Sequence, residues 1–334
     1  MNIYDIAKQS GVSIATVSRV LNGGEKVSPR TKAKVLAVMR REKYTPNAFA
    51  RGLGLNTMRF VGILCTDVAD IFYAKAVSLL ESSLRKHGFD ALLCCTGSEA
   101  EDKEKYLDLL LKKHVDAVIM IGSAFLGSDP AGIAARIGAA ARRIPVVLIN
   151  SMIEKPNVYC VLCDEQKAMN TNVRLLFQNG RRRILYLYDT LTYSGRQKLR
   201  GYREGCLSCG LPEKNQLIVK TEKRMEKARE TTGALLRDKV QFDAVLASED
   251  LIAVGAQKAL ADAGVSVPII GFNDSILARC ATPSLTSVDN MLESLCPAAV
   301  DLLMKVLEGK SVSGKILLSA HLVERETFRV RSQI

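Results

Sequence analysis

Three side chains on the outward face of one short predicted helix carry chemistry that suits DNA bases. They are Ile14, Ala15 and Arg19, within the segment SIATVSRVLN at residues 13–22. In a major groove, apolar side chains meet thymine methyl groups, and an Arg guanidinium makes a bidentate pair with guanine. A solvated face on a small helical bundle would carry the same residue types, so both interpretations are open at this point.

The segments around this helix predict a helix-turn-helix. Before it, IYDIAKQSGV carries apolar residues on one helical face and ends near Gly11, which suits a turn, and Ser13 suits the N-cap of the second helix. The later stretch VSPRTKAKVLAVMRR predicts a third helix capped by Ser28. These three helices make a small all-α head over residues 1–43. The predicted apolar face of the third helix contains Val35, Leu36, Val38 and Met39.

Positive charge is concentrated in the same part of the chain. The formal net charge of the 334 residues is +12. Residues 1–60 hold eleven Lys or Arg against three acidic residues, a net of +8, which leaves +4 for the other 274 residues. A basic head on a nearly balanced body predicts a polyanion as the partner of the head alone.

The head is followed by TPNAFARGLGLNT, which has room for one very short helix. About two helical turns fit over residues 47–53 before Gly52 and Gly54 interrupt them. A helix of this length is marginal alone in water, because nucleation costs more than so few hydrogen bonds return. We therefore expect it to form only when another structure holds it, although the composition is also that of an ordinary interdomain linker.

From Phe60 onward, apolar runs alternate with amphipathic segments. Continuous apolar strands joined by helices are typical of parallel sheets covered on both faces, so two series of them predict an α/β core of two doubly wound parallel-sheet lobes. Ligands of such architectures bind at the carboxyl ends of the strands, here between the lobes. We expect a helix over 291–307 and a strand KILLSAHLV to cross between the lobes. The first series is FVGILC, DALLCC, AVIMIG and VVLIN, and the second is YCVLC, ILYLY, QLIVK, AVLAS and IIGF.

The sequence predicts a cytoplasmic protein that does not enter a membrane. No run of about 18 uncharged apolar residues occurs, and MNIYDIAKQ lacks the apolar core of a signal peptide. The nine cysteines are therefore expected as thiols. Cys160/Cys163 and Cys206/Cys209 have C-x-x-C spacing, but neither pair has zinc-ribbon flanks, so we predict small buried hydrophobic residues and no metal or cofactor.

A nucleotide- or sugar-dependent enzyme on a doubly wound core is the alternative from another functional class. The nearest phosphate-loop candidate lies at 52–54, but Thr57 stands where a third glycine is needed, and the segment precedes the first strand. His87, His114 and His321 are scattered and have no nearby nucleophile pattern. The enzyme is the weaker interpretation, and turnover of a sugar or nucleotide by the pure protein would support it.

Several stretches together resemble the LacI/GalR family of bacterial transcription regulators. They are IYDIAKQSGVSIATVSRVLNG, VSPRTKAKV, YTPNAFARGL, VGILCTDVADIFYAKAV, GFNDSILARCATPSLTSVD and LVERET. The resemblance implies a homodimeric repressor that binds near-palindromic double-stranded operator DNA and has a core like type I periplasmic binding proteins, switched by a small-molecule effector. It implies a head over 1–43, a hinge over 44–58 and a core over 59–334, with lobe one at about 59–158 and 289–315 and lobe two at about 159–288 and 316–334.

The resemblance assigns roles to residues of the head and hinge. The base readers are Ile14, Ala15 and Arg19. In the hinge, the two subunits would pair in the minor groove, where Leu53 wedges into a base step and bends the DNA. The other implied hinge residues are Asn47, Ala50 and Arg51. Supporting contacts to phosphates or base edges are implied for Tyr4, Ser13, Thr16, Ser18 and Asn22.

The resemblance also implies an effector cleft, with one aromatic ring stacked on the ligand. Lys198 stands where the family usually has an Arg that clamps hydroxyls or a carboxylate, and Asn273 replaces a usual carboxylate. There is no Trp. These departures weigh against a plain neutral sugar. We therefore expect a sugar or sugar-derived effector, with Arg196, Arg200 and Lys220 leaving room for a phosphorylated or acidic one, although a charged solvated edge also explains these cations. The implied cleft residues are Asp67, Asp70, Phe72, Tyr73, Ser194, Lys198, Asp250 and Asn273, of which Asp67 and Asp250 equally suit loop caps.

Overall fold

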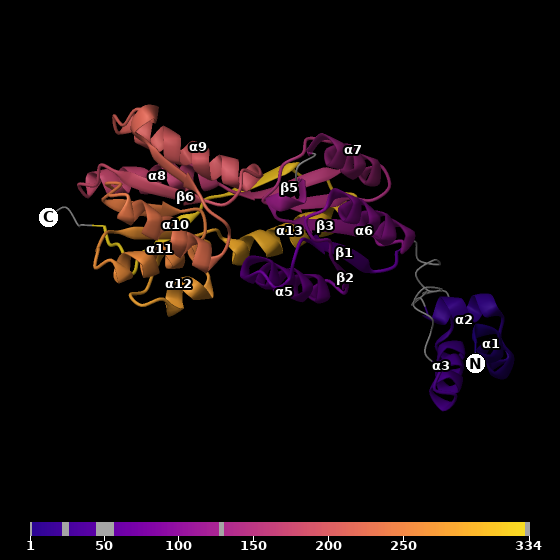
Figure 1. Cartoon of the computed structure of the whole chain (residues 1–334). Helices are drawn as coiled ribbons and strands as arrows, with labels where there is room; N and C mark the ends of the chain where they lie inside the picture. Colours follow the sequence, from indigo (N-terminus) through magenta and orange to yellow (C-terminus); the bar gives the residue numbers. More distant parts are fainter. Residues whose placement is uncertain (1, 22–26, 45–56, 127–129, 331–334) are drawn as a thin grey trace.

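A computed structural model describes residues 2–21, 27–44, 57–126 and 130–330 (Figure 1). The head contains α1 (Ile3–Ser10), α2 (Ile14–Leu21) and α3 (Pro29–Arg41). The predicted caps of α2 and α3 form, because Ser13 Oγ accepts from the backbone N–H of Thr16 at 3.2 Å and Ser28 Oγ from Thr31 at 3.3 Å. The prediction that Leu36 belongs to the buried apolar face of α3 is wrong, because its side chain is 37% exposed. The head core contains Ile6, Ala7, Val17, Val20, Val35, Val38 and Met39.

The first lobe is a six-stranded, wholly parallel sheet with the strand order β11-β5-β4-β3-β1-β2. One of its faces is covered by α5 (Ile71–Lys86) and α13 (Leu292–Leu307), and the other by α6 (Ala100–Lys112) and α7 (Pro130–Ala141). The strands are β1 (Phe60–Cys65), β2 (Asp90–Cys95), β3 (Ala117–Ile121), β4 (Val146–Ile149), β5 (Val158–Cys163) and β11 (Lys315–Leu318).

The second lobe repeats this plan with the strand order β12-β10-β9-β8-β6-β7, in which β12 runs antiparallel to β10. Helices α8 (Glu165–Gln178) and α9 (Tyr193–Ser208) cover one face, and α10 (Met225–Arg237) and α11 (Asp250–Asp262) cover the other, with the short α12 (Ile276–Cys280) beside them. The strands are β6 (Ile184–Tyr188), β7 (Leu217–Lys220), β8 (Ala244–Ala247), β9 (Ile269–Phe272), β10 (Thr286–Asp289) and β12 (His321–Val323).

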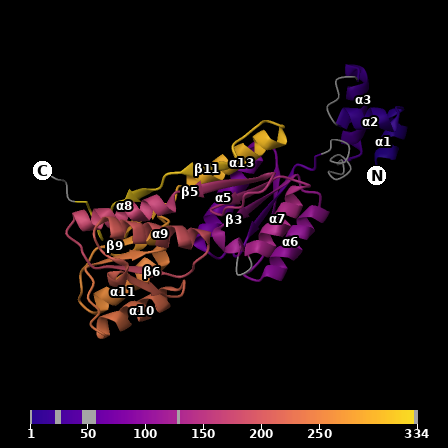
Figure 2. The same ribbon diagram turned by 90° about the horizontal axis from the view of Figure 1, so that it is seen from above.

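The chain crosses between the lobes three times within residues 130–330, after β5, after β10 and between β11 and β12. The expected crossing near the C-terminus is confirmed, and Figure 2 shows this yellow segment running from the first lobe to the second. However, the single predicted strand KILLSAHLV is two strands in two sheets. The prediction that YCVLC begins the second series is wrong, because β5 pairs with β4 and β11. Lobe two therefore begins after residue 163, later than the expected 159. An apolar run in the sequence indicates that a strand is buried, but it does not indicate in which sheet the strand lies.

The cysteines of the first C-x-x-C pair lie on opposite faces of the first sheet. Cys160 packs against the α6 and α7 side and Cys163 against the α5 and α13 side. All nine cysteines are free thiols. Among the described residues, no cluster of His, Cys, Asp or Glu has the grouping that a metal ion needs, and no helix has the length and apolar character to cross a membrane.

Candidate functional site

Helix α2 presents the candidate base readers to solvent. Ile14 is 41% exposed, and Ala15 and Arg19 are exposed as well, while Val17 and Val20 on the opposite side are buried against the rest of the head. The hydrophobic residues on the inner face thus fix the direction of the outer face. Arg19 is one turn beyond the two apolar readers, which is the arrangement that the sequence predicts.

The predicted supporting residues of the head surround this face where the structure describes them. Tyr4 on α1 is 65% exposed. The hydroxyls of Ser13 and Thr16 lie 2.9 Å apart at the start of α2, and Ser18 is half-buried. Asn22 and the hinge residues Asn47, Ala50, Arg51 and Leu53 lie outside the described residues.

A second candidate site is a cavity of about 320 Å³ between the lobes, at the carboxyl ends of the strands of both sheets. The predicted strand-end location is thus where a cavity occurs. Seven of the eight predicted effector residues line it, and they come from both lobes. These are Asp67, Asp70, Phe72, Tyr73, Ser194, Lys198 and Asn273.

An ion-pair network crosses the cavity from one lobe to the other. Asp70 caps α5 by accepting from the backbone N–H of Phe72 at 2.9 Å, and its other carboxylate oxygen lies 2.7 Å from Lys223 Nζ. Lys223 also lies 2.8 Å from Glu249 of the second lobe. Burial opposes the charge on Lys223, but Glu249 and Asp70 together raise the pKa of its ammonium above the usual value. Lys223 therefore stays charged and joins the lobes.

Lys198 is buried and is already occupied by protein groups. Its ammonium donates to the carbonyl oxygen of Ser248 at 2.9 Å, lies 3.8 Å from a Glu165 oxygen and stands 4.1 Å from the centre of the Phe272 ring. Ser194 donates to the same Glu165 carboxylate at 2.5 Å. Burial raises the pKa of Glu165, while Lys198 and Ser194 lower it. Lys198 thus joins the residue after β8 to α8, in addition to lining the cavity.

The two predicted aromatic residues pack edge to face beside the cavity. The ring centres of Phe72 and Tyr73 are 5.3 Å apart at 77°. Tyr73 is 8% exposed and lies under Gly122, where an added Cβ would come within 2.6 Å of the Tyr73 hydroxyl. Gly122 also has φ +86°, so both the space and the backbone favour glycine there. Phe72 is the more exposed of the two rings.

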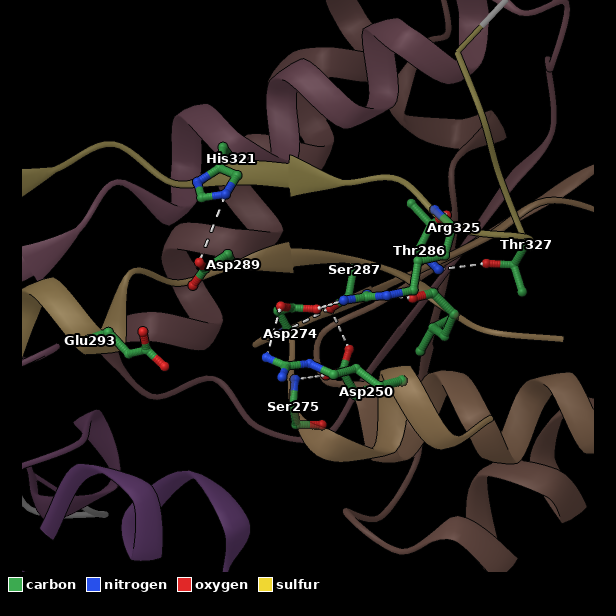
Figure 3. A network of polar contacts seen from close by, with 12 residues as sticks. Asp250, Asp274, Ser275, Thr286, Ser287, Asp289, Glu293, His321, Arg325 and Thr327 are labelled. Carbon is green, nitrogen blue, oxygen red and sulfur yellow. Dashed lines mark hydrogen bonds and ion pairs between the residues drawn. The ribbon is translucent and has the colours of Figure 1, made fainter. Parts of the chain in front are cut away.

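Asp250 does not line this cavity; it anchors the loop that follows β9, and Figure 3 shows its contact with Ser275 of that loop. Its carboxylate accepts from Ser287 Oγ at 2.5 Å and from the backbone N–H of Ser275 at 2.7 Å. The loop it holds carries Asn273, whose φ of 105° is rare for a residue with a side chain. Asp250 thus has the contacts of a loop anchor, and it also lines a neighbouring cavity of about 630 Å³ with Asp70, Phe72 and Asn273, so its role toward an effector stays a prediction. Asp67 combines both, because it lines the cavity and also accepts from the N–H of Ala69 at 2.9 Å.

Two sequence families match the chain over almost its whole length. One, described as periplasmic binding proteins and sugar binding domain of LacI family, matches residues 59–332, and the other, bacterial regulatory proteins of the lacI family, matches residues 2–47. The chain belongs to the LacI family. Members of this family are DNA-binding transcription regulators and not enzymes. The alternative interpretation as a nucleotide- or sugar-dependent enzyme is therefore rejected.

Similar LacI-family proteins cover both the head and the core. An HTH-type transcriptional regulator of Lachnoclostridium phytofermentans is 46% identical over 331 residues, 98% of this chain and 99% of the relative. Catabolite control protein A of Priestia megaterium is 30% identical over 331 residues, 97% of this chain and 98% of the relative. The fold is similar to that of the lac repressor dimer bound to operator and the anti-inducer ONPF, with a TM-score of 0.87, 24% identity and 98% of both chains covered.

Several cavity residues of this LacI-family protein were not predicted. Lys223 and Glu249 form the network across the lobes, Glu165 and Asp189 add carboxylates, and Thr192 meets Ser123 of the first lobe hydroxyl to hydroxyl at 2.7 Å. A usable signal existed for two of them, because Glu165 lies two residues after the end of β5 and Glu249 lies two residues after the end of β8.

The charge of the cavity wall differs from the sequence-based expectation. Among the lining residues that the structure describes, Lys198 and Lys223 are the cations, and both are engaged by protein carboxylates or carbonyls. The three cations that favoured an acidic ligand are exposed and lie outside the lining; these are Arg196, Arg200 and Lys220. The carboxylates of the wall outnumber the lysines, and they are Asp67, Asp70, Glu165, Asp189 and Glu249.

Proposed function

We propose that this LacI-family regulator is a cytoplasmic homodimeric repressor that binds a near-palindromic operator and is switched by a small sugar-like effector. The lac repressor, whose fold it shares, is described as a dimer on operator DNA. The observation that carries the DNA part is the outward face of α2 with Ile14, Ala15 and Arg19 exposed. The domains of the proposal are the head over 1–43, the hinge over 44–58 and the core from 59 on.

The proposed effector is neutral and rich in hydroxyl groups. Its binding residues are those predicted from the sequence that line the cavity, together with Glu165 and Asp189. Carboxylates accept hydrogen bonds from hydroxyls, whereas they repel a phosphate or a carboxylate of the ligand. The excess of carboxylates in the wall therefore favours a neutral sugar over the phosphorylated or acidic effector. The family description as a sugar binding domain supports the same class.

The proposed switch acts by linkage. An effector that enters between the lobes favours one relative orientation of them, and this changes the spacing of the two hinges on DNA. Coupling of about 1–3 kcal/mol, or roughly 5–150-fold in DNA affinity, is ordinary for such a switch. The hinge itself is tested by Leu53→Ala, which should keep nonspecific DNA binding and lose most operator preference.

The test is selection of bound sequences from a random duplex pool with the full-length chain. A near-palindromic site with a flexible central step is the expected result, and affinity should fall steeply with salt because phosphate contacts release counterions. The selected duplex then serves as the probe for a panel of neutral sugars, sugar phosphates and sugar acids. Enrichment of no sequence, with or without the panel, would contradict the proposal, and a response to sugar phosphates alone would contradict the neutral effector.

A further inference from the structure

Two thiols stand side by side at the ends of neighbouring strands in the first lobe. Strands β1 and β2 pair in parallel, and Cys65 is the in-register partner of Cys95. Adjacent strands lie about 4.7–4.9 Å apart, and a disulfide requires Cα atoms about 4.4–6.8 Å apart. The backbone therefore already holds these two residues at a separation that a disulfide accepts.

The pleat of the sheet directs both thiols to the same face. Cys65 belongs to the core under α5 and α13, and Ala91, four residues before Cys95 on β2, packs against the same core. Residues two and four apart on a strand share a face. Burial raises the pKa of Cys65 to about 12, and the nearby Cys95 adds to the rise by charge repulsion and by a side-chain hydrogen bond. Cys94 packs with the α6 and α7 core on the opposite face, so it is directed away from Cys65.

The pair combines one accessible and one inaccessible thiol. Cys65 is fully buried, whereas Cys95 is exposed in the protomer. The strand ends are also joined, because the backbone N–H of Thr96 donates to the carbonyl oxygen of Cys65 at 2.9 Å and that of Gly97 to Thr66 at 2.9 Å. An oxidant that diffuses in from solvent therefore reaches the Cys95 thiol first. The backbone holds the Cys65 thiol next to it.

We propose that Cys65 and Cys95 are a dithiol that a peroxide converts reversibly to a disulfide. In the first step the Cys95 thiolate attacks hydrogen peroxide; an S–O bond forms, the O–O bond breaks, and the departing hydroxide takes a proton to become water. In the second step the Cys65 sulfur attacks the resulting sulfenic acid. The S–S bond forms, the S–O bond breaks, and the Cys65 proton leaves with the hydroxyl as a second water. A small-molecule dithiol reverses the bond by exchange.

The site adjoins the effector cavity without being part of it. The residues that follow Cys65 are Thr66 and Asp67, which line the cavity. A covalent link between the two strand ends therefore lies directly before the loop that carries several of the proposed effector residues. Neither the DNA-reading face nor the identity of the effector enters this inference.

The experiment treats the reduced full-length protein with one equivalent of hydrogen peroxide, alkylates the remaining thiols and maps tryptic peptides without reduction. We expect residues 60–75 to be linked to residues 87–103, two of the nine thiols to be lost, and dithiothreitol to restore both. Because Cys94 shares the second peptide, Cys94→Ser is the matched control and should form the same link. Cys95→Ser should abolish it.

Three results would overturn the proposal. They are a link that persists in Cys95→Ser and disappears in Cys94→Ser, a link between the Cys95 residues of two chains, or loss of the exposed Cys280 thiol before those of the pair. Cys95 is exposed, so its Ser variant should fold, and its circular dichroism spectrum checks this. The test therefore does not depend on a variant of the buried Cys65.

Discussion

In the head, the candidate base readers occupy one eight-residue helix and point outward, whereas the walls of the cavity come from loops of both lobes that are far apart in the sequence. Ile14 and Arg19 lie on a helix that is held by the hydrophobic residues of the head core. Asp70, Lys223 and Glu249 hold one another. Substitutions should therefore act locally and independently in the head, and should spread through shared partners in the core.

The largest effect is expected where one buried group serves several partners. Asp250→Ala leaves the Ser275 N–H and the Ser287 hydroxyl without their acceptor, and an unsatisfied buried donor costs about 1–3 kcal/mol. We expect the free energy of unfolding to fall by about 2–5 kcal/mol, measured by urea denaturation. The matched control is Asp67→Ala, an exposed carboxylate with one local contact, for which about 0.5 kcal/mol or less is expected. Equal losses for both variants would contradict the anchoring role.

The same residue should give the core a pH dependence. Burial raises the pKa of Asp250 from 3.8 to about 6, so the folded state binds this proton more tightly than the unfolded state does. The contribution of Asp250 is therefore complete below pH 4 and is lost as pH rises through 6, by about 3 kcal/mol at 1.4 kcal/mol per pKa unit. Urea denaturation between pH 4 and 7 should show wild type losing stability relative to Asp250→Asn. Parallel curves for the two proteins would contradict this prediction.

In the head, one substitution should affect one base pair. Arg19→Ala should cost about 1–3 kcal/mol at a single position of the selected site, as bidentate pairs with guanine do. Binding to duplexes with each base substituted in turn measures this loss. The control is Lys8→Ala on α1, whose exposed side chain is not a predicted base reader. A uniform loss over all duplexes for Arg19→Ala would assign its guanidinium to phosphate.

The smallest expected effect is the coupling energy between two charges on different lobes. It tests most directly whether side chains of the core depend on one another, as those of the head do not. A double-mutant cycle with Lys223→Met and Asp70→Asn should give about 1–2 kcal/mol, because both side chains are partly shielded from water. The control pair Arg200 and Glu204 is exposed on α9, and about 0.3–0.5 kcal/mol is expected for it. If the two cycles agree, the interlobe network is no stronger than a surface pair.

The sequence predicts the two regions with different success for a physical reason. The head depends on contacts within about 40 residues, so periodicity and caps such as Ser13 and Ser28 specify it. The strands of the core were also predicted, apart from β10 and the division of KILLSAHLV into β11 and β12. The helix predicted over 291–307 is α13, which begins one residue later, at Leu292.

Partner choice in the cavity could not be predicted in the same way. Glu165 and Lys198 are separated by 33 positions in the sequence, and Asp70 and Lys223 by 153. Hydrophobic periodicity does not predict which side chains so far apart will pair. Asp250 illustrates the limit within one residue. The family resemblance predicts that Asp250 lies next to the cavity. Whether its carboxylate faces the ligand or the loop depends on Ser275 and Ser287, which belong to later segments of the chain.

The repeated crossing of the chain between the lobes has a consequence for synthesis. The first sheet takes its edge strand β11 from residues 315–318 and one covering helix, α13, from residues 292–307. A ribosome has therefore made the whole second sheet except β12 before it supplies the last pieces of the first. Domains usually fold one after another as they emerge. In this protein the first lobe must wait, with one face of its sheet only partly covered, until nearly the entire chain has been translated.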